Sequence, residues 1–131
     1  KDEKDEDMKT GSCRQESMMV AACKGLGGGK MEIPDGYPKE LDTRVLPYAI
    51  EIWSDKVTAR YIGAGNHAND HGSVRTDLHI PTAQSVYYFE VFIKNAGKKG
   101  NIAVGFSTAE FDLSRQVGTH ARSWGYRCDI G

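Results

Sequence analysis

The sequence lacks the features of a membrane-spanning or secreted protein. No run of 18 or more apolar residues occurs among its 131 residues, which excludes a membrane-spanning helix by the usual length criterion. The first seven residues, KDEKDED, are all charged and carry none of the apolar stretch of a signal peptide. We therefore expect no membrane partner and a cytoplasmic or nuclear location.

Cysteine is scarce, and the charges balance. Cys13, Cys23 and Cys128 are scattered and odd in number, so neither a disulfide framework nor a CxxC metal clip is indicated. Reduced thiols of an intracellular protein are the simpler interpretation. Lys and Arg total 17 against 18 Asp and Glu, whereas proteins that bind nucleic acid through its phosphates are usually basic. We expect no nucleic-acid partner.

Motifs of nucleotide, metal and catalytic sites are also missing. The stretch CKGLGGGKM resembles a phosphate loop, but Gly25 to Gly29 is one residue too short and Met31 stands where a hydroxyl would bind magnesium. His67 and His71 have the spacing of a helical metal site, yet GAGNHANDHGS around them is typical of a loop. No GxSxG nucleophile elbow occurs. We predict no cofactor, no metal and no enzymatic activity.

Alternation of apolar and polar residues predicts short β-strands. AIEIWS (49–54) and VTARYI (57–62) alternate on either side of a polar pair, which is typical of a hairpin. VRTDLHI (74–80) is a further possible strand. Helical periodicity is missing from this region, apart from one possible turn in AEFDLSR. Short strands punctuated by glycine turns favour an all-β, antiparallel β-sandwich.

The stretch YYFEVFIKNAGKKGNIAVGFS (87–107) carries the strongest pattern. The odd positions of YYFEVFIK (87–94) form one apolar face, and NIAVGF (101–106) resumes the alternation. Between them, NAGKKG supplies Asn and Gly residues suited to positive φ. We predict a hairpin here, with Lys98 and Lys99 serving solubility.

Composition divides the chain into three parts. Residues 1–30 begin with charge and end in glycine, so we expect a disordered extension. Residues 31–45 form a turn-rich lead-in around IPDGYP. Residues 46–131 hold the predicted strands and form the domain.

Three consecutive segments resemble SPRY (B30.2-type) domains. YYFEVFIKNAGKKGNIAVGFS is similar to their central hairpin, HGSVRTDLHIP to the segment before it, and FDLSRQVGTHARSWGYRCDIG to the stretch after it. Within that family the chain resembles the Ran-binding protein M group, in which the last stretch reads R-x-PGW and then GYHGDDG. Matching positions are Arg115, Gly118, Ser123, Gly125, Tyr126, Asp129 and Gly131; differing ones are Val117, Thr119, Arg127, Cys128 and Ile130.

The resemblance implies a bent β-sandwich without catalytic activity, which binds a partner protein or short peptide through loops at one end. Ran-binding protein M-like proteins also serve as scaffolds of a multisubunit ubiquitin ligase containing LisH and CTLH regions. Family members continue with further strands, so the resemblance implies a partial domain, truncated to its N-terminal part. We expect such a half sandwich to expose an apolar sheet face and to be aggregation-prone alone.

The resemblance and the loop chemistry together indicate a set of partner-binding positions. Trp124 among them also suits a core position. The candidates are Asn66, His67, Asp70, Arg115, Gln116, Trp124, Tyr126, Arg127 and Asp129. Two other interpretations stay open: a carbohydrate-binding or enzymatic β-sandwich that shares only the strand pattern, and a nonfunctional truncated product.

Overall fold

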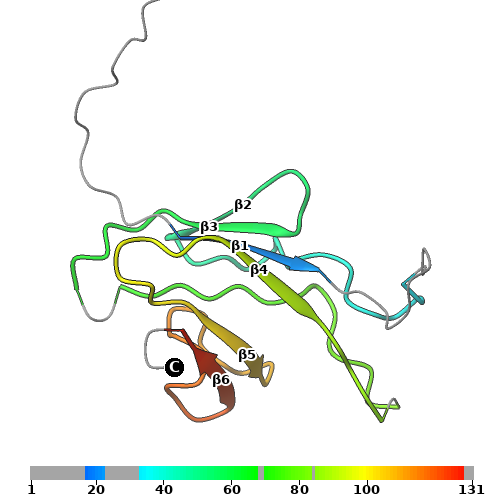
Figure 1. Ribbon diagram of the computed structural model, residues 1–131. Helices are drawn as coiled ribbons and strands as arrows, with labels where there is room; N and C mark the ends of the chain where they lie inside the picture. Colours follow the sequence, from blue (N-terminus) through cyan, green and yellow to red (C-terminus); the bar gives the residue numbers. More distant parts are fainter. Residues whose placement is uncertain (1–16, 23–32, 68–69, 84, 129–131) are drawn as a thin grey trace, which may run out of the picture.

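The computed structural model describes residues 17–22, 33–67, 70–83 and 85–128. These residues form six strands and, within those ranges, no helix, which confirms the predicted all-β antiparallel class. The strands are β1 (Ser17–Ala22), β2 (Ile50–Ile52), β3 (Thr58–Tyr61), β4 (Glu90–Asn95), β5 (Ala103–Ser107) and β6 (Ser123–Arg127). One sheet has the order β2-β3-β1-β4 and the other pairs β5 with β6 (Figure 1).

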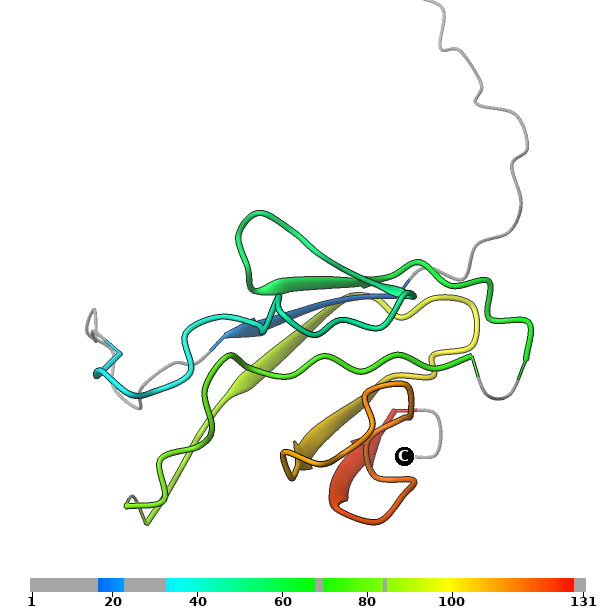
Figure 2. The ribbon, with the colours of Figure 1, turned by 180° about the vertical axis from the view of Figure 1, so that it is seen from behind.

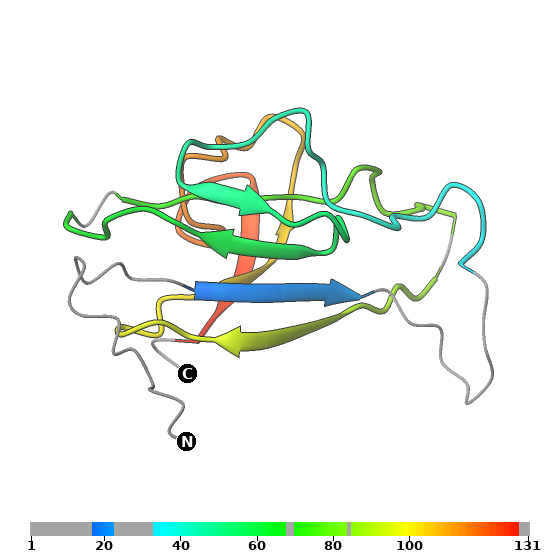
Figure 3. The same ribbon diagram turned by 90° about the horizontal axis from the view of Figure 1, so that it is seen from above.

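The two sheets form two layers of a partial sandwich. Figure 3 shows β5 and β6 crossing the four-stranded sheet at a steep angle on one of its faces. The segment 70–80 runs between the two sheets in Figure 2. This segment bonds to the lead-in, where Asp42 N donates to Arg75 O at 2.8 Å. It also bonds to the segment between β5 and β6, where Leu113 O accepts from Ser73 N at 2.8 Å.

The predicted hairpin of residues 49–62 is confirmed as β2 and β3. Ile50 pairs with Tyr61, and the register continues along both strands. The turn is fixed by Asp55, whose carboxylate accepts hydrogen bonds from the hydroxyl and the backbone N–H of Thr58. These bonds lower the pKa of the Asp55 carboxyl, with the Thr58 hydroxyl as the largest cause. Lys56 takes the left-handed conformation at φ 57°.

The strand β1 corrects the prediction for residues 1–30, which placed no ordered element there. It pairs antiparallel with β3 on one side and β4 on the other, so it lies inside the sheet. Its sequence SMMVAA is short and lacks alternation. Only the two partner strands, distant along the chain, supply the hydrogen bonds that make it a strand. The rest of the predicted extension lies outside the described residues.

The predicted hairpin between residues 87 and 107 is wrong, although both of its strands exist. β4 pairs with β1 and β5 pairs with β6, so the intervening loop crosses from one layer to the other. Gly97 and Gly100 have φ of 68° and 65°, as the turn chemistry predicts. The odd positions Val91 and Ile93 share a groove with Phe106, so the apolar faces meet across the layers. A hairpin would have placed these faces side by side within one sheet.

The predicted strand at residues 74–80 is also wrong. It contributes a single bridge, between Thr76 and Leu41 of the lead-in. Leu41 is buried, and beside it Asp42 accepts three hydrogen bonds from Arg44, including Nε at 2.9 Å and Nη2 at 3.1 Å. The lead-in is therefore packed against the domain. The buried apolar residues are Leu41, Ala49, Ala59, Ile102, Phe111 and Leu113.

Candidate functional site

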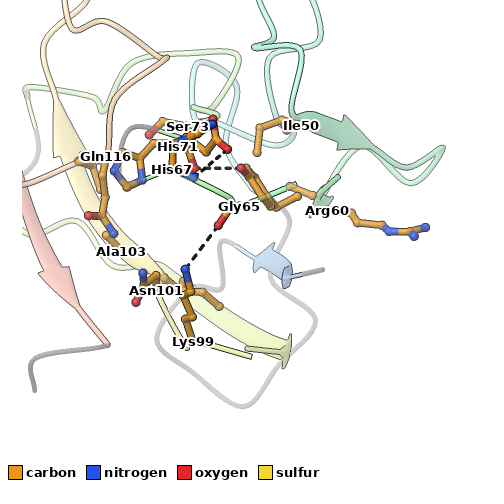
Figure 4. A pocket seen from close by; sticks show the side chains of 16 residues that line it. Ile50, Arg60, Gly65, His67, His71, Ser73, Lys99, Asn101, Ala103 and Gln116 are labelled. Atoms are coloured by element: carbon orange, nitrogen blue, oxygen red, sulfur yellow. Dashed lines mark hydrogen bonds between the residues drawn. The ribbon is translucent and has the colours of Figure 1, made fainter. Parts of the chain in front are cut away.

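A cavity of about 150 Å³ opens where four separate segments of the chain meet. Its wall comes from β2 and β3, the loop 63–73, the turn 97–103 and the segment 116–117 (Figure 4). Polar side chains dominate the rim. The lining residues are Ile50, Ala59, Arg60, Tyr61, Gly65, His67, Asp70, His71, Gly72, Ser73, Lys99, Asn101, Ile102, Ala103, Gln116 and Val117.

The loop 63–73 is held by its own polar groups. Asp70 Oδ2 accepts hydrogen bonds from the backbone N–H groups of Asn66 at 3.0 Å and His67 at 3.3 Å. Tyr61 of β3 donates its hydroxyl to the backbone carbonyl of Asp70 at 2.9 Å. Burial, followed by the nearby Asp70 charge, raises the pKa of Tyr61. These bonds hold Asn66, His67 and Asp70 together beside the cavity.

The apolar floor and the polar rim have distinct origins. Ala59 and Ile102 are each only 4% exposed and line the cavity, so they give it an apolar floor. On the rim, Lys99 donates from Nζ to the carbonyl of Gly65 at 3.4 Å, which places its charge at the opening (Figure 4). Arg60 extends away from the other lining side chains in Figure 4. The site therefore offers an apolar contact surrounded by donors and acceptors.

The segment after β5 is tied to the same loop. Ser73 donates its hydroxyl to the carbonyl of Arg115 at 2.5 Å, and its N–H bonds to Leu113. Gln116 follows directly and lines the cavity. Residues more than forty positions apart in the sequence thus form one continuous wall.

Three relatives show which proteins the chain is similar to. Ran-binding protein M homolog from Arabidopsis thaliana is 39% identical over 77 residues, covering 59% of this chain and 16% of that protein. Ran-binding proteins 9/10 homolog from Drosophila melanogaster is 34% identical over 83 residues, covering 63% and 9%. Ran-binding protein 9 from Xenopus tropicalis is 33% identical over 107 residues, covering 82% and 20%. The chain is similar in sequence to a part of each of these Ran-binding proteins.

The matched part spans between 9% and 20% of these three proteins' own length. No family model matches the chain, and no solved structure matches it significantly. The relatives confirm the resemblance to the Ran-binding protein M group that the strand segments indicated.

The predicted site residues separate into two places. His67, Asp70 and Gln116 line the cavity together, and Asn66 and Arg115 adjoin it through their backbones. Trp124 and Tyr126 do not reach the cavity; they line a second groove between the two sheets. Arg127 is a β6 residue that pairs with Ala103, and Asp129 lies outside the described residues.

The second groove is open and almost entirely apolar, with a volume of about 610 Å³. Trp124 is 63% exposed and Tyr126 is 65% exposed, so the core position considered for Trp124 is wrong. Cross-strand pairing places Tyr126 opposite Val104 and Trp124 opposite Phe106. The groove is lined by Phe89, Val91, Ile93, Val104, Gly105, Phe106, Trp124, Gly125, Tyr126 and Cys128.

Several cavity residues were missed by the sequence patterns. Lys99 was assigned to solubility, and Tyr61 and Asn101 were not considered as site residues. Lys99 contacts a carbonyl 34 positions away, so no local pattern could reveal its place. The alternation in VTARYI does place Tyr61 and Ala59 on one face, which was the available signal.

In the described part of the chain, no group of three or more His, Cys, Asp or Glu side chains could hold a metal ion. The same residues include no helix long and apolar enough to cross a membrane.

Proposed function

We propose that the chain is a non-catalytic interaction module that holds a partner protein, or a short peptide of it, in the cavity. One observation carries the proposal: four segments converge to surround an apolar floor with polar groups. Binding sites commonly combine an apolar surface with a few fixed polar groups. The relationship to Ran-binding proteins supports a role in protein interaction.

The size of the cavity favours a peptide side chain over a small cofactor. Sites for drug-sized ligands usually measure about 300–1,000 Å³, whereas this cavity measures about 150 Å³. One or two anchoring side chains fill such a volume, while the backbone of the peptide bonds to groups on the rim. Lys99, Asn101 and Gln116 stand where they can donate to it.

We also propose a cellular setting. The resemblance to the Ran-binding protein M group supports a role as an adaptor or scaffold part of a CTLH-type ubiquitin ligase, in the cytoplasm or nucleus. Tagged chain expressed in cells is expected to copurify with subunits of that ligase and to show cytoplasmic or nuclear fluorescence. Copurification that survives both cavity substitutions described below would assign the ligase contact to another surface.

The binding proposal is tested with a random peptide display library selected against the whole chain. Peptides that bind are then measured against Lys99→Glu and Gln116→Ala, which change two rim residues. Lys98→Glu is the matched control, because it makes the same charge change one residue away, outside the cavity lining. We expect at least about a tenfold loss of affinity, about 1.4 kcal/mol, with the two rim variants and none with the control.

Three outcomes would contradict the proposal. Peptides that bind all variants equally would move the site elsewhere. Glycan-array binding without any peptide binding would favour the carbohydrate-binding alternative. A well-folded chain that binds neither class would support a product without this function.

A further inference from the structure

A chain of hydrogen bonds links Arg115 to the wall of the cavity through His120. Arg115 Nη1 lies 2.7 Å from His120 Nε2, and His120 Nδ1 lies 2.7 Å from the hydroxyl of Thr119. The Thr119 hydroxyl in turn lies 2.7 Å from the carbonyl of Gln116, a residue that lines the cavity.

The chemistry of these groups fixes where the protons lie. A guanidinium can only donate, so Nε2 of His120 must accept from Arg115. The neutral ring then carries its proton on Nδ1, which donates to Thr119. The Thr119 hydroxyl gives its own proton to the Gln116 carbonyl, a group that can only accept. The bond from Arg115 thus requires His120 to be neutral and in the Nδ1–H form.

We propose that His120 is a positioning residue whose protonation releases the side chain of Arg115, the residue before Gln116 of the cavity wall. A proton on Nε2 replaces the acceptor with a donor and places two cations against each other. Arg115 then loses this partner and keeps Asp112, whose carboxylate lies 3.5 Å from its Nε. The bond between Arg115 and His120 is therefore broken, while Nδ1–H can still donate to Thr119.

The surrounding groups favour this response. The backbone of the turn is held separately, because Ser123 donates to the His120 carbonyl and accepts from Gly118 N–H. The charged side chains of this network are Arg115, which contacts the ring, and Asp112, which pairs with Arg115. Ser73 bonds to backbone carbonyls of this segment, its hydroxyl to Arg115 and its N–H to Leu113. The side-chain link can therefore open while the turn keeps its shape.

The first test is nitrogen-15 NMR of the whole chain in the absence of any ligand. We expect the His120 ring to show the Nδ1–H form at pH 8, and the Arg115 Nε–H signal to move between pH 8 and pH 5, where histidines change charge. In His120→Gln, an amide oxygen can accept from Arg115 at every pH, so the Arg115 signal should stay constant. His79→Gln, which removes an exposed histidine elsewhere, should leave the wild-type movement intact.

A ring with its proton on Nε2, or equal movement of the Arg115 signal in His120→Gln, would overturn the proposal. Should His120→Gln not fold, Arg115→Ala gives a second test. Removing the guanidinium removes the donor to Nε2, so the His120 ring should no longer be held in the Nδ1–H form. These signals are measured without a binding partner, so they test the role of His120 independently of the proposed function. Only the effect on binding rests on the proposed function.

The consequence for binding is measured with the selected peptides. His67 and His71 also line the cavity, so the wild-type profile alone is not decisive. We expect affinity to fall by at least about threefold more between pH 8 and pH 5 in the wild type than in His120→Gln, a difference of about 0.7 kcal/mol. An equal fall in peptide affinity in the two proteins would show that His120 does not influence binding.

Discussion

The ring of Phe89, just before β4, meets the ring of Phe106 in β5 edge to face, with centroids 5.4 Å apart. This contact joins the two sheets. It continues a row of rings in which Tyr87 lies 6.2 Å from Phe89 and Tyr37 lies 6.5 Å from Tyr87. The lead-in and both layers are thus connected through aromatic side chains.

Replacing Phe89 with Ala removes the centre of that row. We expect a loss of about 2 kcal/mol in the free energy of unfolding, from partial burial and the ring pair together. Urea unfolding of the whole chain measures the change. Phe92→Ala is the control, because Phe92 is 67% exposed on the opposite face of β4, and we expect less than about 1 kcal/mol from it. Equal losses would show that Phe89 does not join the layers.

Glycine at position 105 is required by the close approach of β5 and β6. A Cβ at Gly105 would overlap the carbonyl oxygen of Trp124 and come within 2.6 Å of Gly125 Cα. We expect Gly105→Ala to cost about 3 kcal/mol or more, because backbone must move. Gly100→Ala is the contrast: φ is +65° but no atom lies within 4 Å, so only the strain of about 1 kcal/mol remains. Urea midpoints of both variants should rank in that order.

The ion pair of Asp42 and Arg44 predicts a dependence of stability on acidity. Hydrogen bonds from the Arg44 side chain are the largest cause that holds the pKa of Asp42 below its ordinary value of 3.8. The ionised carboxylate therefore stabilises the fold fully above that value, and the contribution is lost as the pH falls through the folded-state pKa. Asp42→Asn should unfold at lower urea concentration at pH 7.

The gap between wild type and Asp42→Asn should close as the pH falls from 3.8 through the lower folded-state pKa, because both side chains are neutral only below that pKa. Asp35→Asn serves as the control, because the Asp35 carboxylate is fully exposed in its pair with Lys39. A gap that stays constant with pH would contradict the role given to the Asp42 charge.

Tyr61 predicts a change at alkaline pH. Its raised pKa means that the fold favours the protonated phenol, so this contribution holds below pH 10.0 and is lost as the pH rises through the folded-state pKa. Tyr61→Phe should lower stability at pH 7 by about 1 kcal/mol, because the bond to the Asp70 carbonyl is lost. The pKa of Tyr88 is also raised, through its bond to Glu90, so an ultraviolet titration should show more than one component above pH 10.0. The component of Tyr61 should be lost in this variant. Retention of that component would assign it to another tyrosine.

The exposed aromatic residues of the apolar groove predict self-association at high protein concentration. Trp124→Ser and Tyr126→Ser should lower the associated fraction in analytical ultracentrifugation. Tyr48→Ser removes a side chain that is 81% exposed but lies outside this groove, so it should have little effect. A wild-type chain that stays monomeric and melts in one sharp two-state transition would refute the prediction.

The sequence by itself determined the class of the fold and most of its strands. Alternation in VTARYI and YYFEVFIK reports which side chains face inward, because a strand turns successive residues to opposite sides. The odd positions from Tyr87 to Ile93 are indeed less exposed than the even ones. Turn residues such as Gly97 were found for the same local reason, since a positive φ suits glycine.

Pairing between strands was decided only by the tertiary structure. β1 has no pattern of its own, and β4 pairs with it in preference to β5 although β5 is nearer in sequence. The hydrogen-bonding edge of a strand carries no mark of its partner, so adjacency along the chain suggested a hairpin that does not form.

The site follows the same division. The loop residues His67 and Asp70 stood out by composition, whereas Lys99 joined them through a contact with Gly65 made only in the folded chain. The exposed position of Trp124 likewise depends on how the layers meet. Local sequence therefore determined which way side chains face, and long-range packing decided what they face, because that depends on residues far away along the chain.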